Sequence, residues 1–183
     1  DLKRAEEQIS HMANHDALTG LPSLRLGKDR LTSAVAHAHR HDSKVALMFG
    51  DLDGFKEVND TIGHDAGDEV LVGVAKRLTD CVRETDTVAR IGGDEFTVVI
   101  TEVSDKDAIA NVAKKIIDSV SEPFILSDGA AQTTIGASVG IAIYPDHGKN
   151  AEALVRLADK AMYTVKRRGK NNYVFVDEID PED

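Results

Sequence analysis

The segment "RIGGDEFTVVI", residues 90–100, limits the possible folds more than any other part of the sequence. It joins two short runs rich in strand-forming residues, "DTVARI" and "FTVVITEV", which we interpret as strands. Glycine supplies the positive φ that tight hairpin turns need, so Gly92 and Gly93 predict an antiparallel hairpin. Asp94 and Glu95 then lie at the hairpin tip, either as solvated turn residues or as part of a site.

A second strand-like segment, "KVALMFGDLD", also ends in acidic residues. Because successive side chains alternate along a strand, Asp51 and Asp53 point to the same face, with Leu52 between them. The segment is not an EF-hand calcium loop, since that loop requires a third ligand where Phe55 stands and glycine where Lys56 stands. From this pattern alone, the two acids are either a solvated strand cap or part of a site.

The two acidic strand ends are more informative together than apart. If the strands are neighbours, Asp51, Asp94 and Glu95 converge, which is electrostatically unfavourable without a cation. With Mg²⁺ the same carboxylates form an oxygen-ligand site of the kind that binds nucleotide phosphates. Two such ions, about 3.5–4 Å apart, can hold the attacking and leaving oxygens of a phosphoryl transfer.

Hydrophobic periodicity predicts the remaining elements of the chain. Helices are expected over residues 1–13, 23–41, 63–83, 105–121 and 151–168, and further strands over residues 133–144 and 172–176. In the strand over 133–144, Gly136, Ser138 and Gly140 share one face, against which another element must pack closely. No repeat or internal linker is visible, so we expect one α/β domain with antiparallel strand pairs.

Composition limits the partners and the location of the chain. Its 183 residues include 22 basic and 32 acidic ones, and the formal charge of −10 argues against a nucleic acid polymer as partner. A divalent metal and a few lysines can still hold a small phosphate ligand. No apolar run approaches the ~20 residues of a membrane helix. We therefore expect no membrane contact by this segment and a cytoplasmic location, or the cytoplasmic part of a membrane-bound sensor. The single cysteine, Cys81, is expected to be buried.

The first predicted helix carries a short apolar stripe. Leu2, Ala5, Ile9 and Met12 follow one another at spacings of three, four and three residues. One interpretation is the end of a linker helix that pairs with a second chain. The alternative is a short amphipathic helix that lies on its own domain.

Basic and polar residues flank the acidic strand ends. Lys56 follows Asp51, and four basic residues cluster after residue 165, namely Lys166, Arg167, Arg168 and Lys170. Taken alone, such a cluster commonly compensates a helix dipole. Asn59 and Asp68 are polar positions downstream of the first acids, and an aspartate can accept hydrogen bonds from guanine.

Other motifs indicate no further chemistry. The sequence has no GxxxxGK[ST] loop, no HExxH and no CxxC. His37 and His41 are four residues apart, which is compatible with a metal pair on a helix. Because no acidic third ligand is near them in sequence, we favour an exposed helix surface for this pair.

From about residue 15 to residue 175, the sequence resembles the GGDEF domains of diguanylate cyclases. The resemblance rests on an ordered set of segments: "HDALTGLPS", "DLDGFKEVNDTIGHDAGDEVL", "GGDEF" and "ADKAMYTVKRRGKN". It implies an α/β (α+β) palm-like nucleotidyl cyclase fold, a central, mostly antiparallel five-stranded sheet surrounded by helices, with the GGDEF hairpin. It also implies three parts of the chain. Residues 1–13 are the end of an N-terminal linker or coiled-coil helix, residues 14–177 are the catalytic domain, and residues 178–183 are a C-terminal tail.

The resemblance further implies a bacterial signalling reaction, with this chain as the output domain of a larger protein. Two GTP molecules are condensed to cyclic di-GMP, with release of two pyrophosphates, across a homodimer in which each domain binds one GTP. Two Mg²⁺ ions serve each active site, with Mn²⁺ as an alternative. The implied metal-binding and catalytic groups are Asp51, Asp94, the Leu52 carbonyl and Glu95, which is also a candidate general base. Of the implied nucleotide-binding residues, Asn59 and Asp68 bind guanine. The phosphates are bound by Lys56, Lys166, Lys170 and the Phe55 backbone. Gly92 and Gly93 leave room for the nucleotide to approach.

The segment "RETD", Arg83 to Asp86, is separated from Gly92 by five residues. In the family this spacing forms an inhibitory site for the product, cyclic di-GMP. An arginine can stack on a purine or form paired hydrogen bonds to a phosphate, and an aspartate can accept guanine donors.

Three positions depart from the family pattern. Ser23 stands where Asn is usual, Lys170 where Arg is frequent, and Gly50 where a larger apolar residue usually precedes the first acid. Gly50 leaves open whether the strand beneath Asp51 keeps its working geometry. The intact acids disfavour a module that only senses cyclic di-GMP through the "RETD" segment, and the acidic balance disfavours a polymerase, which needs a basic groove.

Overall fold

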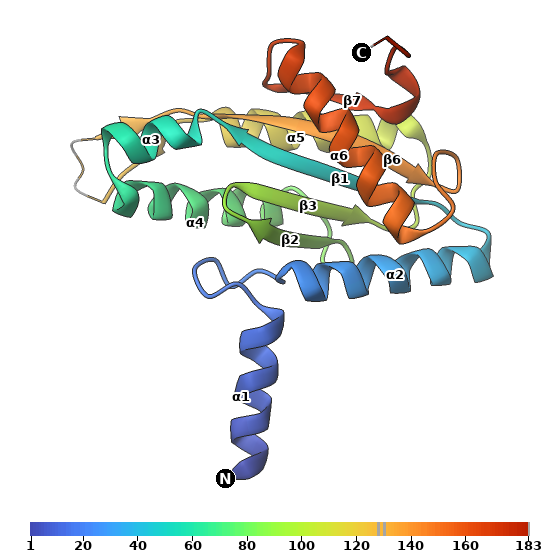
Figure 1. Ribbon diagram of the computed structural model, residues 1–183, viewed down its shortest axis with the longest axis horizontal. Coiled ribbons are helices and arrows are strands. Elements are labelled where there is room, and N and C mark those ends of the chain that lie inside the picture. Colours follow the sequence, from blue (N-terminus) through green and yellow to red (C-terminus); the bar gives the residue numbers. More distant parts are fainter. Residues whose placement is uncertain (128, 130, 183) are drawn as a thin grey trace.

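The two strands that carry the acidic residues are neighbours in one five-stranded sheet (Figure 1). The structure, a computed structural model, describes residues 1–127, 129 and 131–182. In spatial order the strands are β2 (Thr87–Gly92), β3 (Glu95–Ile100), β1 (Val45–Asp53), β6 (Gly136–Tyr144) and β7 (Asn172–Phe175). All neighbours are antiparallel except β6 and β7, which are parallel. The predicted, mostly antiparallel five-stranded sheet is therefore confirmed.

Helices cover both faces of this sheet. Their bounds are α1 (Leu2–Asn14), α2 (Leu24–His41), α3 (Phe55–Thr61), α4 (His64–Asp80), α5 (Lys106–Ser121) and α6 (Ala151–Arg167). Helices α2 and α6 pack on one face, and α4 and α5 pack on the other. The sequence did not predict α3 or the small pair β4 (Phe124–Ile125) and β5 (Gln132–Thr133), because such short pieces carry no readable period.

Alternation along the central strands builds two hydrophobic layers. Ala46, Met48 and Ile141 face the layer that α4 and α5 complete. Leu47 and Phe49 face the layer that α2 and α6 complete. Because both faces of β1 are buried, this strand is an almost continuous apolar run until its acidic end.

The small residues of β6 lie where α6 and the turn after it approach the sheet. A Cβ atom added at Gly140 would lie 2.0 Å from the Ala158 carbonyl oxygen, and one added at Gly136 would lie 2.8 Å from Asn171 Oδ1. Ser138, between them, is fully buried. The predicted close packing against this face is confirmed, and it holds the end of α6 against the acidic end of β1.

Helix α1 projects away from the domain and buries none of its residues (Figure 1). Leu2 and Met12 are each 77% exposed, and Ile9 is 67% exposed. The alternative of a helix lying on its own domain is therefore wrong, and pairing with a second chain stays a prediction. In the described part of the chain, no helix combines the length and apolarity that crossing a bilayer requires.

Ion pairs fasten the segment after β7 to the domain. It begins with a 3-10 turn over Val176–Glu178. Lys106 Nζ lies 3.2 Å from Asp177 Oδ2 and 2.9 Å from Glu178 Oε1. These ion pairs fasten the start of the predicted tail to α5, while Asp183, its last residue, lies outside the described residues.

Candidate active site

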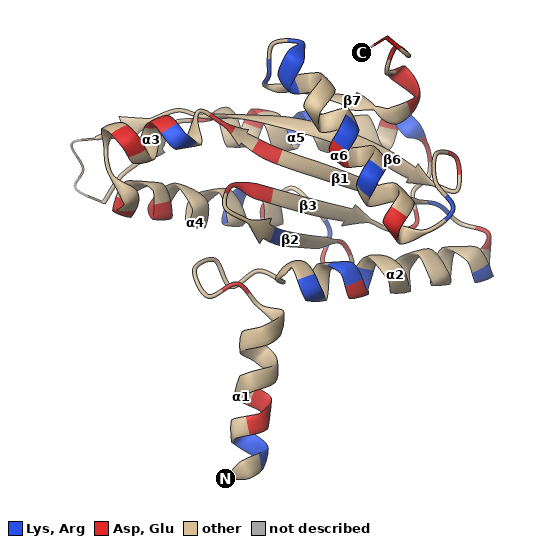
Figure 2. Ribbon diagram, in the orientation of Figure 1, with Lys and Arg blue, Asp and Glu red and all other residues tan. Residues whose placement is uncertain are grey.

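Strand register brings the predicted carboxylates to one end of the sheet. Asp51 of β1 is paired directly with Glu95 of β3, and Leu52 N donates a hydrogen bond to the Asp94 carbonyl oxygen at 3.2 Å. Gly93, with φ of +51°, makes the turn from which Asp94 enters β3. Figure 2 shows the resulting acidic positions at the adjacent ends of β1 and β3. The predicted meeting of the two acidic strand ends is thus what the structure shows.

Lys166, at the end of α6, forms ion pairs with both acidic residues at the end of β1. Its Nζ is 3.0 Å from Asp51 Oδ2 and 3.2 Å from Asp53 Oδ1. The Asp53 carboxylate also accepts hydrogen bonds from Ser138 Oγ at 2.8 and 2.9 Å and from Asn171 N at 2.9 Å. Sequence reasoning placed Asp53 beside Asp51 but gave it no role, because its partners come from distant segments.

Burial and the negative charge of Asp51 raise the pKa values of three neighbouring carboxyl groups. Burial and then the negative charge of Asp51 raise the pKa of Asp94 to about 6. Burial, followed by the charges of Asp51 and Asp159, raises the pKa of Glu95. Burial and Asp51 likewise raise the pKa of Asp159. Asp159 was missed, although it lies two helical turns before Lys166 and so shares its face of α6.

The donor set at this end of the sheet fits a divalent cation by its chemistry. Asp51 Oδ1 is buried, and no donor among the described residues reaches it. Asp94, Glu95 and the Leu52 carbonyl add oxygens of the kind that Mg²⁺ binds. As they stand, no three acidic, histidine or cysteine side chains in the described part of the chain converge as a metal site. The site therefore fits a divalent cation by the type of its oxygen donors. In this structure the Asp51 carboxylate is paired with Lys166.

The predicted nucleotide-binding residues lie on the elements that border this cluster. Asn59 is half-buried on α3, and Asp68 is exposed on α4. A Cβ atom at Gly67 would lie 1.8 Å from Asn59 Oδ1, so this glycine lets α3 and α4 approach closely. Phe55 is buried and Lys56 exposed at the start of α3. Their contact with a nucleotide stays a prediction.

The glycines lie at the hairpin tip that precedes Asp94, and the last lysine lies in the turn after α6. Gly92 and Gly93 are exposed at the hairpin tip, with open space where a Cβ atom would stand. Lys170 is exposed in the turn after α6, where its φ is +66° and its N–H donates to the Val165 carbonyl oxygen at 3.0 Å. The space at the glycines is compatible with the predicted approach of a nucleotide.

Sequence reasoning missed an arginine that holds the hairpin tip. Arg90 NH1 lies 3.1 Å from both carboxylate oxygens of Asp16, in the loop after α1. The same guanidinium donates from Nε and NH2 to the Gly93 carbonyl oxygen, at 3.0 and 2.8 Å. Burial would raise the pKa of Asp16, but hydrogen bonds from Thr19 and Arg90 outweigh it and lower that pKa. One side chain therefore connects the N-terminal loop with the turn before Asp94.

Replacing Arg90 by Lys should destabilise the domain by about 2 kcal/mol, because a lysine keeps the charge and loses the paired hydrogen bonds. Urea unfolding measures this change. The matched control is Lys44→Met, which breaks the exposed Lys44–Asp146 ion pair and should cost no more than about 0.5 kcal/mol. Equal losses in the two variants would contradict a special role for Arg90.

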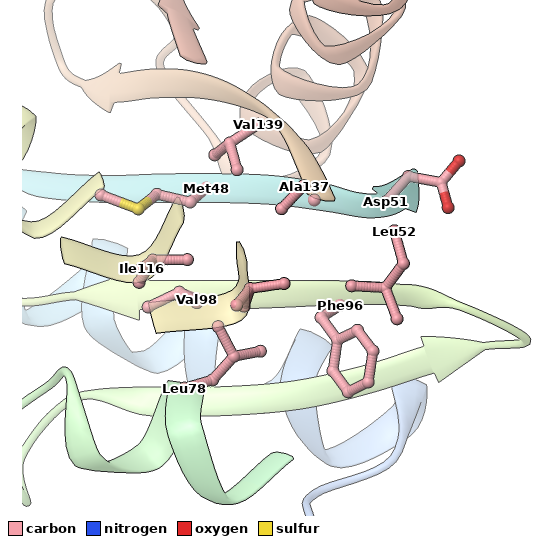
Figure 3. A pocket seen from close by; sticks show the side chains of 11 residues that line it. Met48, Asp51, Leu52, Leu78, Phe96, Val98, Ile116, Ala137 and Val139 are labelled. Atoms are coloured by element: carbon pink, nitrogen blue, oxygen red, sulfur yellow. The ribbon is translucent and has the colours of Figure 1, made fainter. Parts of the chain in front are cut away.

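A small apolar cavity lies beneath the end of β1 (Figure 3). Its volume is about 30 Å³, and its lining includes Gly50, Phe96 and Val139. In Figure 3 the Asp51 carboxylate points away from this space, so the cavity belongs to the core and not to the acidic cluster. The missing side chain of Gly50 accounts for part of it.

Replacing Gly50 by Ala should stabilise the domain by about 1 kcal/mol, because a strand glycine is entropically costly and a methyl group gains apolar contact. An added Cβ atom would meet Val139 Cγ2 at 3.7 Å, an ordinary contact distance. Thermal and urea unfolding measure the change. The control, Gly140→Ala, should destabilise, since its Cβ atom would clash with the Ala158 carbonyl oxygen. Loss of stability in both variants would contradict the cavity explanation.

The "RETD" segment forms an ion pair between α4 and β2. Arg83 donates from NH2 to Asp86 Oδ1 at 3.1 Å and from Nε to Oδ2 at 3.2 Å, and it also contacts the Thr101 carbonyl oxygen. The Arg83 side chain is 53% exposed, whereas that of Asp86 is 3% exposed. Arg83 borders hollows of about 310 and 500 Å³. The guanidinium is available to a ligand, and the carboxylate lies beneath it.

Cys81 and the histidine pair of α2 occupy the structural positions that the sequence analysis favoured. Cys81 is buried in the core. His37 and His41 are exposed on α2 with their rings stacked 4.1 Å apart. Among the residues described, neither histidine belongs to a group of three or more metal-ligating side chains.

Known proteins are similar to this chain in sequence and in fold. A family model described as "Diguanylate cyclase, GGDEF domain" matches residues 13–172. The bifunctional diguanylate cyclase/cyclic di-GMP phosphodiesterase MucR of Pseudomonas aeruginosa is 44% identical over 174 residues, which are 95% of this chain and 25% of MucR. The diguanylate cyclase TpbB of the same species is 40% identical over 180 residues, 98% of this chain and 41% of TpbB. The chain thus spans less than half the length of these curated relatives.

Solved structures agree with the sequence comparison. The GGDEF domain of TpbB superposes with a TM-score of 0.86 at 41% identity, covering 88% of this chain and 94% of that one. The coiled coil and GGDEF domain of DgcB from Caulobacter crescentus, solved in complex with cyclic di-GMP, gives a TM-score of 0.87 at 28% identity, covering 95% and 91%. The chain therefore belongs to the diguanylate cyclase GGDEF-domain family.

Proposed function

We propose that this domain condenses two GTP molecules into cyclic di-GMP and two pyrophosphates. The observation that carries the proposal is the strand register that sets Asp51 opposite Glu95, next to Asp94, with Lys166 on the same cluster. Carboxylates and a lysine at one end of a rigid sheet suit phosphoryl transfer, which depends on positioning and charge stabilisation.

The metal-binding residues in this proposal are Asp51, Asp94, the Leu52 carbonyl and Glu95. Two Mg²⁺ ions, or Mn²⁺ in their place, would supply charge neutralisation at the attacking and leaving oxygens. Glu95 is the candidate base for the attacking 3′-hydroxyl, and its raised pKa improves it as a proton acceptor.

The remaining residues bind and orient the nucleotide. Lys56, Lys166 and Lys170 are assigned to the phosphates together with the Phe55 backbone, and Gly92 and Gly93 keep the hairpin tip narrow. Asn59 and Asp68 are assigned to guanine, where an aspartate accepts from the N1 and N2 donors. Support comes from the position of Asn59 on α3, which directly follows β1, and of Asp68 on α4, which packs against α3.

Each domain would bind one GTP, so catalysis requires a homodimer. The apolar stripe of α1, with Leu2, Ile9 and Met12 exposed, supports pairing through this helix, as does similarity to the coiled-coil form of DgcB. We assign the domain to a larger cytoplasmic or membrane-attached signalling protein. Cyclic di-GMP is proposed both as the product and as an inhibitor bound at Arg83 and Asp86.

The test is product formation by the chain fused to a dimeric coiled coil. Incubation with GTP and Mg²⁺ should yield cyclic di-GMP and pyrophosphate in a 1:2 ratio, and the unfused chain should show a specific activity that rises with protein concentration. Absence of cyclic di-GMP from the folded, dimeric fusion with either Mg²⁺ or Mn²⁺ would refute the proposal.

A further inference from the structure

Lys166 lies between two carboxylates that differ in their other contacts. Asp53 is only 9% exposed and is fully engaged, with Ser138 Oγ and Asn171 N as further donors. Asp51 has a buried oxygen, Oδ1, that no donor among the described residues reaches. The contact of Lys166 with Asp53 is therefore structural. Asp51, in contrast, keeps one oxygen that can bind a ligand.

Asp53 also holds the turn that follows α6. The N–H group that it accepts belongs to Asn171, whose Oδ1 in turn accepts from Ala137 N at 3.3 Å. Lys170 and Asn171 have φ values of +66° and +48°. Non-glycine residues adopt this backbone region only where other contacts compensate its cost. The contacts of Asp53 therefore position Lys166 directly and Lys170 through the turn.

We propose that Asp53 is a positioning residue that keeps Lys166 at the site while Lys166 exchanges Asp51 for a substrate phosphate. This inference rests on the proposed function. In the nucleotide-free protein, Lys166 is the counter-ion of Asp51. With Asp51 engaged as a metal ligand, Lys166 would stay attached to Asp53 and its ammonium group would be free to bind a phosphate.

The exchange has opposite consequences for two ligands. Without nucleotide, Lys166 competes with a divalent cation for Asp51, so its removal should strengthen cation binding. With GTP present, Lys166 contributes a phosphate contact, so its removal should weaken GTP binding. A lysine that only bound phosphate, away from Asp51, would produce the second effect without the first.

The experiment measures free Mn²⁺ by electron paramagnetic resonance in nucleotide-free protein. Lys166→Met should bind Mn²⁺ about tenfold more tightly than wild type, the size expected for loss of one partly buried competing ion pair. The matched control is Lys44→Met, which removes the same charge before the opposite end of β1 and should leave Mn²⁺ affinity unchanged. Circular dichroism establishes that each variant is folded.

A second variant tests Asp53 without removing the lysine. Asp53→Asn keeps the shape of the side chain, and it leaves Lys166 with Asp51 as its carboxylate partner. Mn²⁺ binding should weaken about threefold, and the KM for GTP should rise about tenfold with kcat within about threefold of wild type. A defect that is only structural would lower kcat with the folded fraction and leave the KM unchanged.

The outcomes separate this inference from the proposed function. If the folded, dimeric wild-type protein makes no cyclic di-GMP and Lys166→Met still binds Mn²⁺ more tightly, the competition for Asp51 stands and the cyclase is refuted. Unchanged or weaker Mn²⁺ binding by Lys166→Met, in a wild-type protein that is an active cyclase, would overturn the exchange alone. An unchanged KM in Asp53→Asn would overturn the positioning role.

Discussion

Asp94→Asn should abolish cyclic di-GMP synthesis and leave the domain at least as stable as wild type. The activity should fall by at least about 10³-fold, because an amide replaces the charged carboxylate with a single neutral ligand oxygen, and phosphoryl transfer needs the charge. The free energy of unfolding should rise by about 1 kcal/mol at neutral pH, a value already reduced for the partial exposure of Asp94. A loss of activity together with a gain of stability indicates an acid kept for function, since replacing a structural acid would lower the stability.

The stability gain should depend on pH in a defined direction. The pKa of Asp94 is raised from 3.8 to about 6, because burial and the charge of Asp51 disfavour ionisation. The folded state therefore holds this proton more tightly than the unfolded state does. Its contribution to stability is present near pH 4 and is lost as the pH rises through about 6. The variant lacks this loss, so its advantage over wild type should grow between pH 4 and pH 7.

Urea unfolding at several pH values, with the cyclase assay beside it, measures both effects. Asp146→Asn is the matched control, since Asp146 is an exposed aspartate paired with Lys44. It should retain full activity and show no such pH trend. A stability loss in Asp94→Asn, or an advantage that is constant with pH, would show that Asp94 is not held in an unfavourable charge cluster.

The sequence predicted the elements and the acidic cluster well, because both leave local signals. Alternation and helical spacing define β1, β6 and α6, and the glycines before Asp94 identify the hairpin. Convergence of Asp51 with Glu95 required only that β1 and β3 be neighbours, and the register confirms this pairing. The family resemblance then supplied roles that no periodicity could give.

Residues that act through distant partners left no such signal. Asp53 depends on Ser138 and Asn171, which are 85 and 118 positions away along the chain. Arg90 depends on Asp16, at a separation of 74 positions. A single sequence does not indicate which of its 32 acidic residues forms an ion pair or hydrogen bond with which distant partner. These contacts come from the tertiary arrangement of α6 and the N-terminal loop around the sheet.

Arg83→Ala should relieve inhibition by the product without changing the initial rate. The exposed Arg83 guanidinium is the group that can stack on a purine or bind a phosphate, and its loss should weaken cyclic di-GMP binding by about 30-fold or more. The initial rate should stay within about twofold of wild type. Calorimetry with cyclic di-GMP, and progress curves with and without added product, measure the two quantities. Arg156→Ala, which removes an exposed arginine from α6, is the control and should leave both unchanged.

Asp86 is a less suitable probe of the same site, for a structural reason. Its carboxylate is almost completely buried and accepts from the backbone N–H groups of Arg83 and Thr101, at 2.9 and 3.2 Å. Asp86→Ala should therefore cost about 2 kcal/mol of stability in addition to any loss of product binding. If Arg83→Ala left cyclic di-GMP affinity unchanged while Asp86→Ala reduced it, the segment would be a structural turn whose loss perturbs a product site elsewhere. If both reduced affinity and only Asp86→Ala reduced stability, Arg83 would be the ligand and Asp86 the residue that positions it.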